Sequence, residues 1–97
     1  MRKVTQQIAN AFAQGTPKAV GNTWTDGQTV YLHTNKIVER TNDGIFMSLA
    51  GWNTATTRER LNGIAQVLGL DISFHQKDFE PYLNGSIVHA TEWFKVS

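Results

Sequence analysis

The sequence contains no cysteine, which excludes a disulfide framework, thiol catalysis and any zinc site that requires thiolate ligands. It also lacks the run of about 18 apolar residues that a membrane-spanning helix needs, and Met1-Arg2-Lys3 is not followed by a signal-peptide core. Neither sign of charge is in excess, because nine Lys and Arg residues oppose eight Asp and Glu residues. The net charge of +1 gives no general attraction to DNA and excludes an acidic DNA mimic. We therefore expect a soluble cytoplasmic protein and find no motif that calls for a cofactor or metal.

The 97 residues are enough for one domain and too few for two independent ones. A hydrophobic content of 40% and an aromatic content of 10% supply one modest core and exclude a disordered chain. We therefore expect a single domain over residues 1–97.

A helical period opens the chain, with Val4, Ile8 and Phe12 on one side. Gly15 is a typical helix stop, and Pro17 prevents the helix from resuming. From residue 18 to residue 52 the period changes to two. Short polar breaks separate four apolar or β-branched runs: Ala19–Trp24, Thr29–His33, Lys36–Arg40 and Ile45–Ala50. Breaks this short hold no crossover helix, so the runs predict a four-stranded antiparallel meander.

The run Ile45–Ala50 is apolar on both faces, which predicts a central strand or one that contacts a partner. A second helix then begins, with Thr56 as the expected N-cap and Glu59 completing a capping box. Gly69 ends this helix, and Gly63 inside it indicates a close approach to the sheet or simple tolerance. Alternation returns in four further segments: Leu70–Lys77, Tyr82–Leu83, Ser86–His89 and Trp93–Val96.

These elements predict an α+β fold, in which an antiparallel β-meander packs with two α-helices and further hairpin strands follow at the C-terminus. The pattern leaves open whether the last strands extend the first sheet or form a second one. The helices are expected to cover one sheet face only.

Several short motifs resemble a group of small bacteriophage proteins. They include Gly21-Asn22-Thr23, Leu32-His33, Ala50-Gly51-Trp52, Thr56-Thr57-Arg58-Glu59-Arg60-Leu61-Asn62 and Tyr82-Leu83-Asn84-Gly85. The likeness covers most of Gly21–Gly85 and is strongest from Trp52 to Asn62. It implies a phage accessory gene whose product acts in the bacterial cytoplasm, by binding, on a host process or defence. It implies no particular activity, cofactor or catalytic residue.

The start of the second helix carries a candidate anion site. Arg58 and Arg60 lie in the first turn, where unpaired N–H groups already carry partial positive charge. With Thr57 and Asn62 they form a candidate phosphate or carboxylate site. The alternative is that each arginine pairs internally with a turn carboxylate, such as Asp26 or Asp43.

A second candidate surface is the sheet face without helices. We expect Tyr31, Phe46 and Trp52 there, with His33 on the same side as Tyr31. An uncovered apolar sheet face is typical of a partner site. The partner would be a host protein or a second copy of the chain.

The three histidines allow a lesser alternative. His33, His75 and Lys77 would form an acid–base set for phosphodiester hydrolysis if their strands met, and His89 could complete a metal site. No paired carboxylate or HExxH spacing supports these chemistries, and an isolated histidine is more often structural. The sequence thus favours a non-catalytic phage protein that binds a host protein or itself, with phosphate binding as the alternative.

Overall fold

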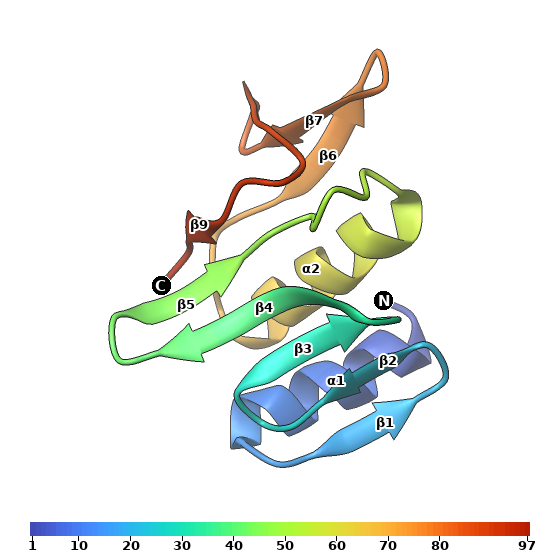
Figure 1. Cartoon of the computed structure of the whole chain (residues 1–97), viewed down its shortest axis with the longest axis vertical. Helices are drawn as coiled ribbons and strands as arrows, with labels where there is room; N and C mark the ends of the chain where they lie inside the picture. Colours follow the sequence, from blue (N-terminus) through green and yellow to red (C-terminus); the bar gives the residue numbers. More distant parts are fainter.

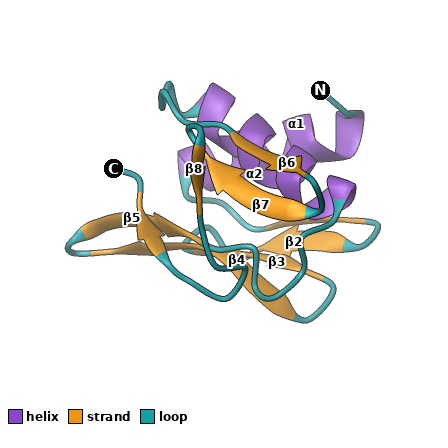
Figure 2. Ribbon diagram, turned by 90° about the horizontal axis from the view of Figure 1, so that it is seen from above, coloured by secondary structure: helices purple, strands orange, loops and turns teal.

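The computed structural model describes all 97 residues as two helices and nine strands. Six strands form one antiparallel sheet, in the order β1-β2-β3-β4-β5-β9, and three form a second, in the order β6-β7-β8. Figure 2 shows α1 and α2 together on one side of the large sheet, with β6 and β7 on that same side. The predicted α+β class is therefore confirmed, and the opposite face of the large sheet carries no helix (Figure 1).

The bounds of the helices are α1 (Lys3–Gln14) and α2 (Ala55–Val67). The bounds of the strands are β1 (Lys18–Val20), β2 (Thr23–Thr25), β3 (Thr29–Leu32), β4 (Asn35–Thr41), β5 (Gly44–Met47), β6 (Phe74–Lys77), β7 (Glu80–Leu83), β8 (Ser86–Ile87) and β9 (Phe94–Lys95).

The first helix follows its sequence pattern closely. Ile8 and Phe12 are fully buried, and Gly15 ends the helix in the left-handed conformation with φ of 73°. The N–H of Gly15 donates to the carbonyl of Phe12, which satisfies one of the last open carbonyl groups of the helix. The predicted helix and its stop are confirmed.

The meander has five strands, so the prediction of four was wrong. The run Ala19–Trp24 is divided by a turn at Gly21-Asn22, and Ala19 pairs with Trp24 across the hairpin. Gly21 has φ of 60°, a value that glycine adopts without steric cost. A two-residue turn preserves the alternation of apolar and polar residues, so the period alone does not reveal it.

Strand β5 is interior, as predicted, because it pairs with β4 on one side and with β9 on the other. Both alternatives for the C-terminal strands are realised: β9 joins the large sheet, whereas β6, β7 and β8 form the second one. The first of these strands begins at Phe74, so the expected strand over 70–77 is four residues shorter than predicted.

The second helix begins two residues earlier than predicted. Its N-cap is Thr54, whose hydroxyl accepts from the backbone N–H of Thr57, so the capping box on Thr56 was wrong. The carboxylate of Glu59 is engaged elsewhere: it accepts from the hydroxyl of Thr5 and from the backbone N–H of Arg2. The sequence offers three threonines within four positions around this start (Thr54, Thr56 and Thr57), and pattern alone does not select among them.

The core lies between the helices and the large sheet. A β-bulge in β4, opposite Val30 and Tyr31, leaves both Ile37 and Val38 buried. Gly63 on α2 meets Thr5 on α1, because a Cβ at residue 63 would overlap the methyl group of that threonine. The close approach at Gly63 is therefore between the two helices, so the predicted approach to the sheet was wrong.

Candidate functional site

Arg60, predicted to bind anions, is almost fully buried and points into the protein. Its guanidinium donates to the hydroxyls of Thr23 (2.9 Å) and Thr5 (3.0 Å) and pairs with the carboxylate of Glu59. A further bond reaches the side-chain oxygen of Asn22 at 3.3 Å. The group therefore joins α1, α2 and β2, and its donors are directed at protein acceptors. The internal pairing expected with Asp26 or Asp43 is replaced by the pair with Glu59.

Burial affects the carboxyl of Glu59 as well. Desolvation alone would raise its pKa, but the hydroxyl of Thr5, the backbone N–H of Arg2 and the guanidinium of Arg60 together lower the pKa below its usual value of 4.5. Glu59 is thus a charged member of an internal network.

Arg58 lies at the surface and makes no ion pair. Its guanidinium donates to the side-chain oxygens of Asn53 (2.6 Å) and Gln76 (3.2 Å). Asn53 in turn donates to the backbone carbonyl of Phe79 at 3.3 Å. These bonds fasten the β6–β7 hairpin to the start of α2.

The other two members of the predicted anion site are also engaged internally. Thr57 is 1% exposed, and its hydroxyl lies 2.9 Å from that of Thr54. The amide of Asn62 accepts from the N–H of Phe74 (2.7 Å) and donates to its carbonyl (2.8 Å), so it pairs with β6 as a neighbouring strand would. The four residues do not form one accessible cluster.

The histidines do not gather into one site. His33 lies in the turn between β3 and β4, and His75 lies on β6 with its ring stacked on Tyr82 at a centroid separation of 5.4 Å. The two line different hollows. No three side chains of His, Asp or Glu lie close enough together to hold a metal ion, so the metal site with His89 is not formed.

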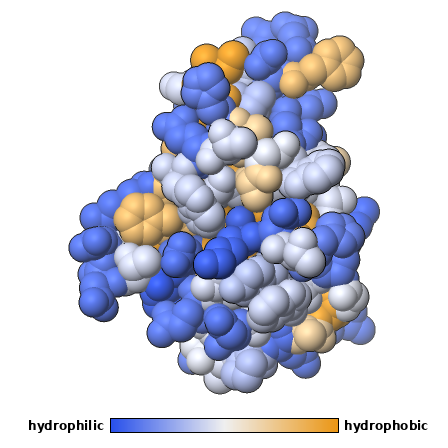
Figure 3. All heavy atoms as spheres, viewed as in Figure 1, coloured by the Kyte–Doolittle hydropathy of each residue, from blue (hydrophilic) through white to orange (hydrophobic).

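The helix-free face of the large sheet is more polar than expected. Tyr31 stacks on Trp24 at a centroid separation of 3.9 Å, and both rings are partly exposed. Phe46 is half-buried between its strand partners Glu39 and Lys95. Figure 3 shows a largely hydrophilic surface with scattered apolar groups, so this face carries no continuous apolar patch.

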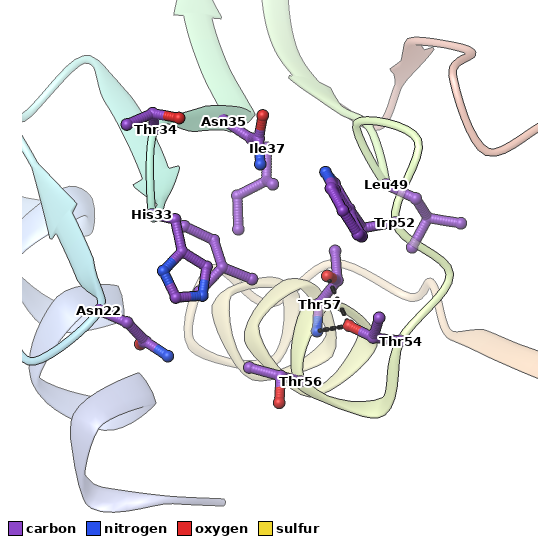
Figure 4. A pocket seen from close by; sticks show the side chains of 11 residues that line it. Asn22, His33, Thr34, Asn35, Ile37, Leu49, Trp52, Thr54, Thr56 and Thr57 are labelled. Atoms are coloured by element: carbon purple, nitrogen blue, oxygen red, sulfur yellow. Dashed lines mark hydrogen bonds between the residues drawn. The ribbon is translucent and has the colours of Figure 1, made fainter.

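Trp52 lies away from that face, in the loop between β5 and α2, and is 58% exposed. It forms one wall of a hollow of about 520 Å³, which we call the Trp52 hollow. The hollow is lined by Asn22, Leu32, His33, Thr34, Asn35, Ile37, Leu49, Trp52, Thr54, Thr56 and Thr57. Figure 4 shows Trp52 and His33 on opposite sides of this space. The structure therefore brings together three predicted site residues, Trp52, His33 and Thr57, in a way that the sequence analysis did not foresee.

Comparison with known proteins places the chain in a phage lineage. The family model of the Kyanoviridae Gp96 protein matches residues 1–97. The chain belongs to this family of cyanophage proteins. The predicted resemblance to small phage proteins is thereby confirmed. No curated protein and no solved structure matches the chain significantly.

One further feature of this Gp96 family member, the exposure and backbone strain of Phe79, was not foreseen from the sequence. The β6–β7 hairpin ends in a two-residue turn, Asp78-Phe79, in which both residues have positive φ (52° and 65°). Such a turn is normally occupied by Asn, Asp and Gly. Phe79 is 89% exposed, more than any other large hydrophobic side chain. A short break of Asn, Asp or Gly after an alternating run is the sequence signal for such a turn. A phenylalanine in the break does not give this signal.

Neither helix of this family member has the length and apolar composition required to cross a membrane.

Proposed function

We propose that this phage protein acts by binding a host protein, without catalysis, and that the contact is made by Phe79 at the tip of the β6–β7 hairpin. The observation that carries the proposal is the combination of an aromatic ring that is 89% exposed with a backbone that phenylalanine adopts only at a cost. A left-handed conformation costs a non-glycine residue about 1–2 kcal/mol. Strained and exposed residues of this kind are concentrated at functional sites.

The tip is held in place before any partner arrives. Asn53 bonds the carbonyl of Phe79, and Arg58 bonds both Asn53 and Gln76. Because the ring is presented on a braced turn, its binding needs little ordering of the chain, which favours affinity. The partner surface that suits it is an apolar socket, since a buried aromatic anchor in a pocket is the common form of an interface hot spot.

The acidic and basic neighbours of the ring limit the choice of partner. Lys77, Asp78 and Glu80 flank Phe79 and are exposed, so a bilayer interior would have to accept two carboxylates beside the ring. A protein socket with a polar rim accommodates the same arrangement. Membership in a cyanophage family makes proteins of the infected cell the natural partners.

The test is photo-crosslinking followed by direct binding. Benzoylphenylalanine placed at position 79 should crosslink a defined host protein in a lysate of the cyanobacterial host. The same group at Gln14, an exposed position on α1, should not. The purified host protein should then bind the parent chain at least tenfold more tightly than the Phe79→Gly variant.

Phe79→Gly is a matched variant because glycine accepts the left-handed turn. It removes the ring and relieves the backbone cost, while the greater freedom of glycine in the unfolded chain returns about 0.4–1 kcal/mol. Its free energy of unfolding should therefore stay within about 1 kcal/mol of the parent value. Equal affinity of parent and Phe79→Gly, or crosslinking that is the same from positions 79 and 14, would overturn the proposal. A crosslinked dimer of the chain would replace the host partner with a second copy.

A further inference from the structure

We propose that the Trp52 hollow is a second binding site, which accepts an uncharged planar heterocycle of the nucleobase class. The site lies between the β3–β4 turn and the start of α2, and it shares no lining residue with the hairpin tip. The inference is therefore independent of the function proposed for Phe79.

The size and floor of the hollow suit a small ligand. Its volume of about 520 Å³ falls within the roughly 300–1,000 Å³ that is usual for small-molecule sites. The floor is formed by Leu32, Ile37 and Leu49, which are 5%, 1% and 0% exposed. A planar ring that enters the hollow would therefore contact the apolar floor and stack on the open face of the indole.

The indole of Trp52 supplies the stacking face. Figure 4 shows the ring edge-on, with one face turned into the hollow, where no other aromatic ring covers it. In the same picture, hydrogen bonds join only Thr54 and Thr57 among the residues drawn. The polar groups of His33 and Asn35 remain available at the rim, whereas the hydroxyl of Thr56 points away from the hollow (Figure 4).

These rim groups distinguish a nucleobase from the aromatic side chain of a peptide. The imidazole and the carboxamide supply both donors and acceptors, which match the edge of a base. A phenyl ring would cover them without pairing them, and unpaired polar groups in a closed site lower affinity. The lining contains no Asp, Glu, Lys or Arg, so it holds no carboxylate, ammonium or guanidinium that would pair with a charged ligand.

Backbone strain on both sides supports a binding role for the hollow. His33 has φ of 57° and Ala50, two residues before Trp52, has φ of 56°. Neither residue is a glycine, yet both adopt the left-handed conformation. One turn carries the imidazole of His33, and the other leads into the indole of Trp52. Two independent strained turns that converge on one hollow are the pattern expected where geometry is maintained for a ligand.

The test uses nuclear magnetic resonance titration of the full chain with adenosine, guanosine, cytidine and uridine at millimolar concentration. At least one nucleoside should cause saturable shifts of the Trp52 indole N–H and of the His33 and Asn35 backbone amides. The Trp52→Ala variant should bind at least tenfold more weakly, because stacking on the indole is lost. The Trp24→Phe variant, which alters an exposed indole outside the hollow, should bind as the parent does.

Two further arms identify the source of the base. Equal affinity for a nucleoside and its monophosphate assigns the site to the base alone, whereas much tighter binding of a six-nucleotide single strand assigns it to a base within a strand. N-acetyltryptophanamide serves as the peptide-like probe. Saturation by this probe and by no nucleoside, or the absence of any saturable shift, would overturn the proposal. The Phe79→Gly variant should bind nucleosides normally, so failure of the tip proposal and failure of this one are separately visible.

Discussion

At the scale of single residues, Arg60 shows how a sequence feature that suggests a ligand can instead serve the fold. Its guanidinium bonds Thr23, Thr5 and Glu59, which belong to three different elements. The sequence shows that an arginine lies in the first turns of a helix. It does not show that the acceptors of two other elements converge on that arginine, because the nearest of these in sequence, apart from Glu59, is 37 residues away.

Replacing Arg60 by methionine should therefore destabilise the protein strongly. The change removes the guanidinium bonds to Glu59, Thr5 and Thr23 in a largely buried setting, and we expect a loss of about 2–4 kcal/mol. Arg58→Met is the matched control, since its guanidinium bonds only surface amides, and its loss should be below about 1 kcal/mol. Urea denaturation at neutral pH measures both. Similar losses in the two variants would contradict the assignment of Arg60 to the core.

The network around Glu59 also predicts a pH dependence. The pKa of this carboxyl is lower in the folded protein than in the unfolded chain. The unfolded chain therefore takes up the proton first as the pH falls. The stabilisation is present above the usual value of 4.5 and is lost as the pH falls through the folded pKa.

The free energy of unfolding should thus fall as the pH drops below about 5, and Glu59→Gln should show a smaller fall. Asp26 contributes at lower pH, because hydrogen bonds from the backbone N–H groups of Gln28 and Thr29 lower its pKa below the usual value of 3.8. Asp26→Asn is therefore a second reference, and the double variant should be flatter than either single one. Urea titrations at successive pH values measure the slopes. Parallel curves for the parent and Glu59→Gln would show that the network does not hold the carboxylate.

At the scale of elements, the sequence predicts most of the features that leave a periodic pattern of apolar residues. Both helices, the meander and the interior place of β5 follow from apolar spacing and turn residues. The division of residues 19–24 into β1 and β2 does not, because a two-residue turn leaves the alternation unchanged. The exact start of α2 does not either, because Thr54, Thr56 and Thr57 are equally suitable caps by residue type. Packing decides between them.

The contact between α1 and α2 gives a prediction at this scale. Alanine is a better helix former than glycine by about 1 kcal/mol, yet Gly63→Ala should destabilise the protein by about 1–3 kcal/mol. The added methyl would overlap Thr5, whose hydroxyl is fixed between Glu59 and Arg60 and whose side chain is therefore unable to turn away. Thr5→Ser removes the obstructing methyl and keeps the hydroxyl. The double variant should recover most of the loss in urea denaturation, and a double variant no more stable than Gly63→Ala alone would contradict the close approach.

At the scale of the whole molecule, Phe74 joins the two sheets. It is 2% exposed, packs edge-on against Phe94 at 6.1 Å between centroids, and is bonded through its backbone to Asn62 of α2. The second sheet therefore projects Phe79 from a base that is anchored in the main core. The two proposed binding features could not be predicted from the sequence, because each depends on how separate elements pack together. Trp52, His33 and Thr56 meet only because a turn, a loop and a helix start converge.

The last strand of the chain, β9, completes the large sheet beside β5, and its removal should change both stability and self-association. Strand β9 covers the edge of β5, where Val96 donates to the carbonyl of Ile45 and Ile45 donates to the carbonyl of Ser97. Deleting residues 93–97 removes Phe94 from Phe74 and exposes that edge. We expect a loss of about 3 kcal/mol or more and increased self-association, because an uncovered strand edge pairs with other chains. Phe94→Ala separates the two effects: it loses the ring contact but keeps the backbone bonds, so it should be destabilised without added self-association. Urea denaturation and light scattering read the two quantities, and a truncated chain that associates no more than Phe94→Ala would show that β9 does not protect the edge.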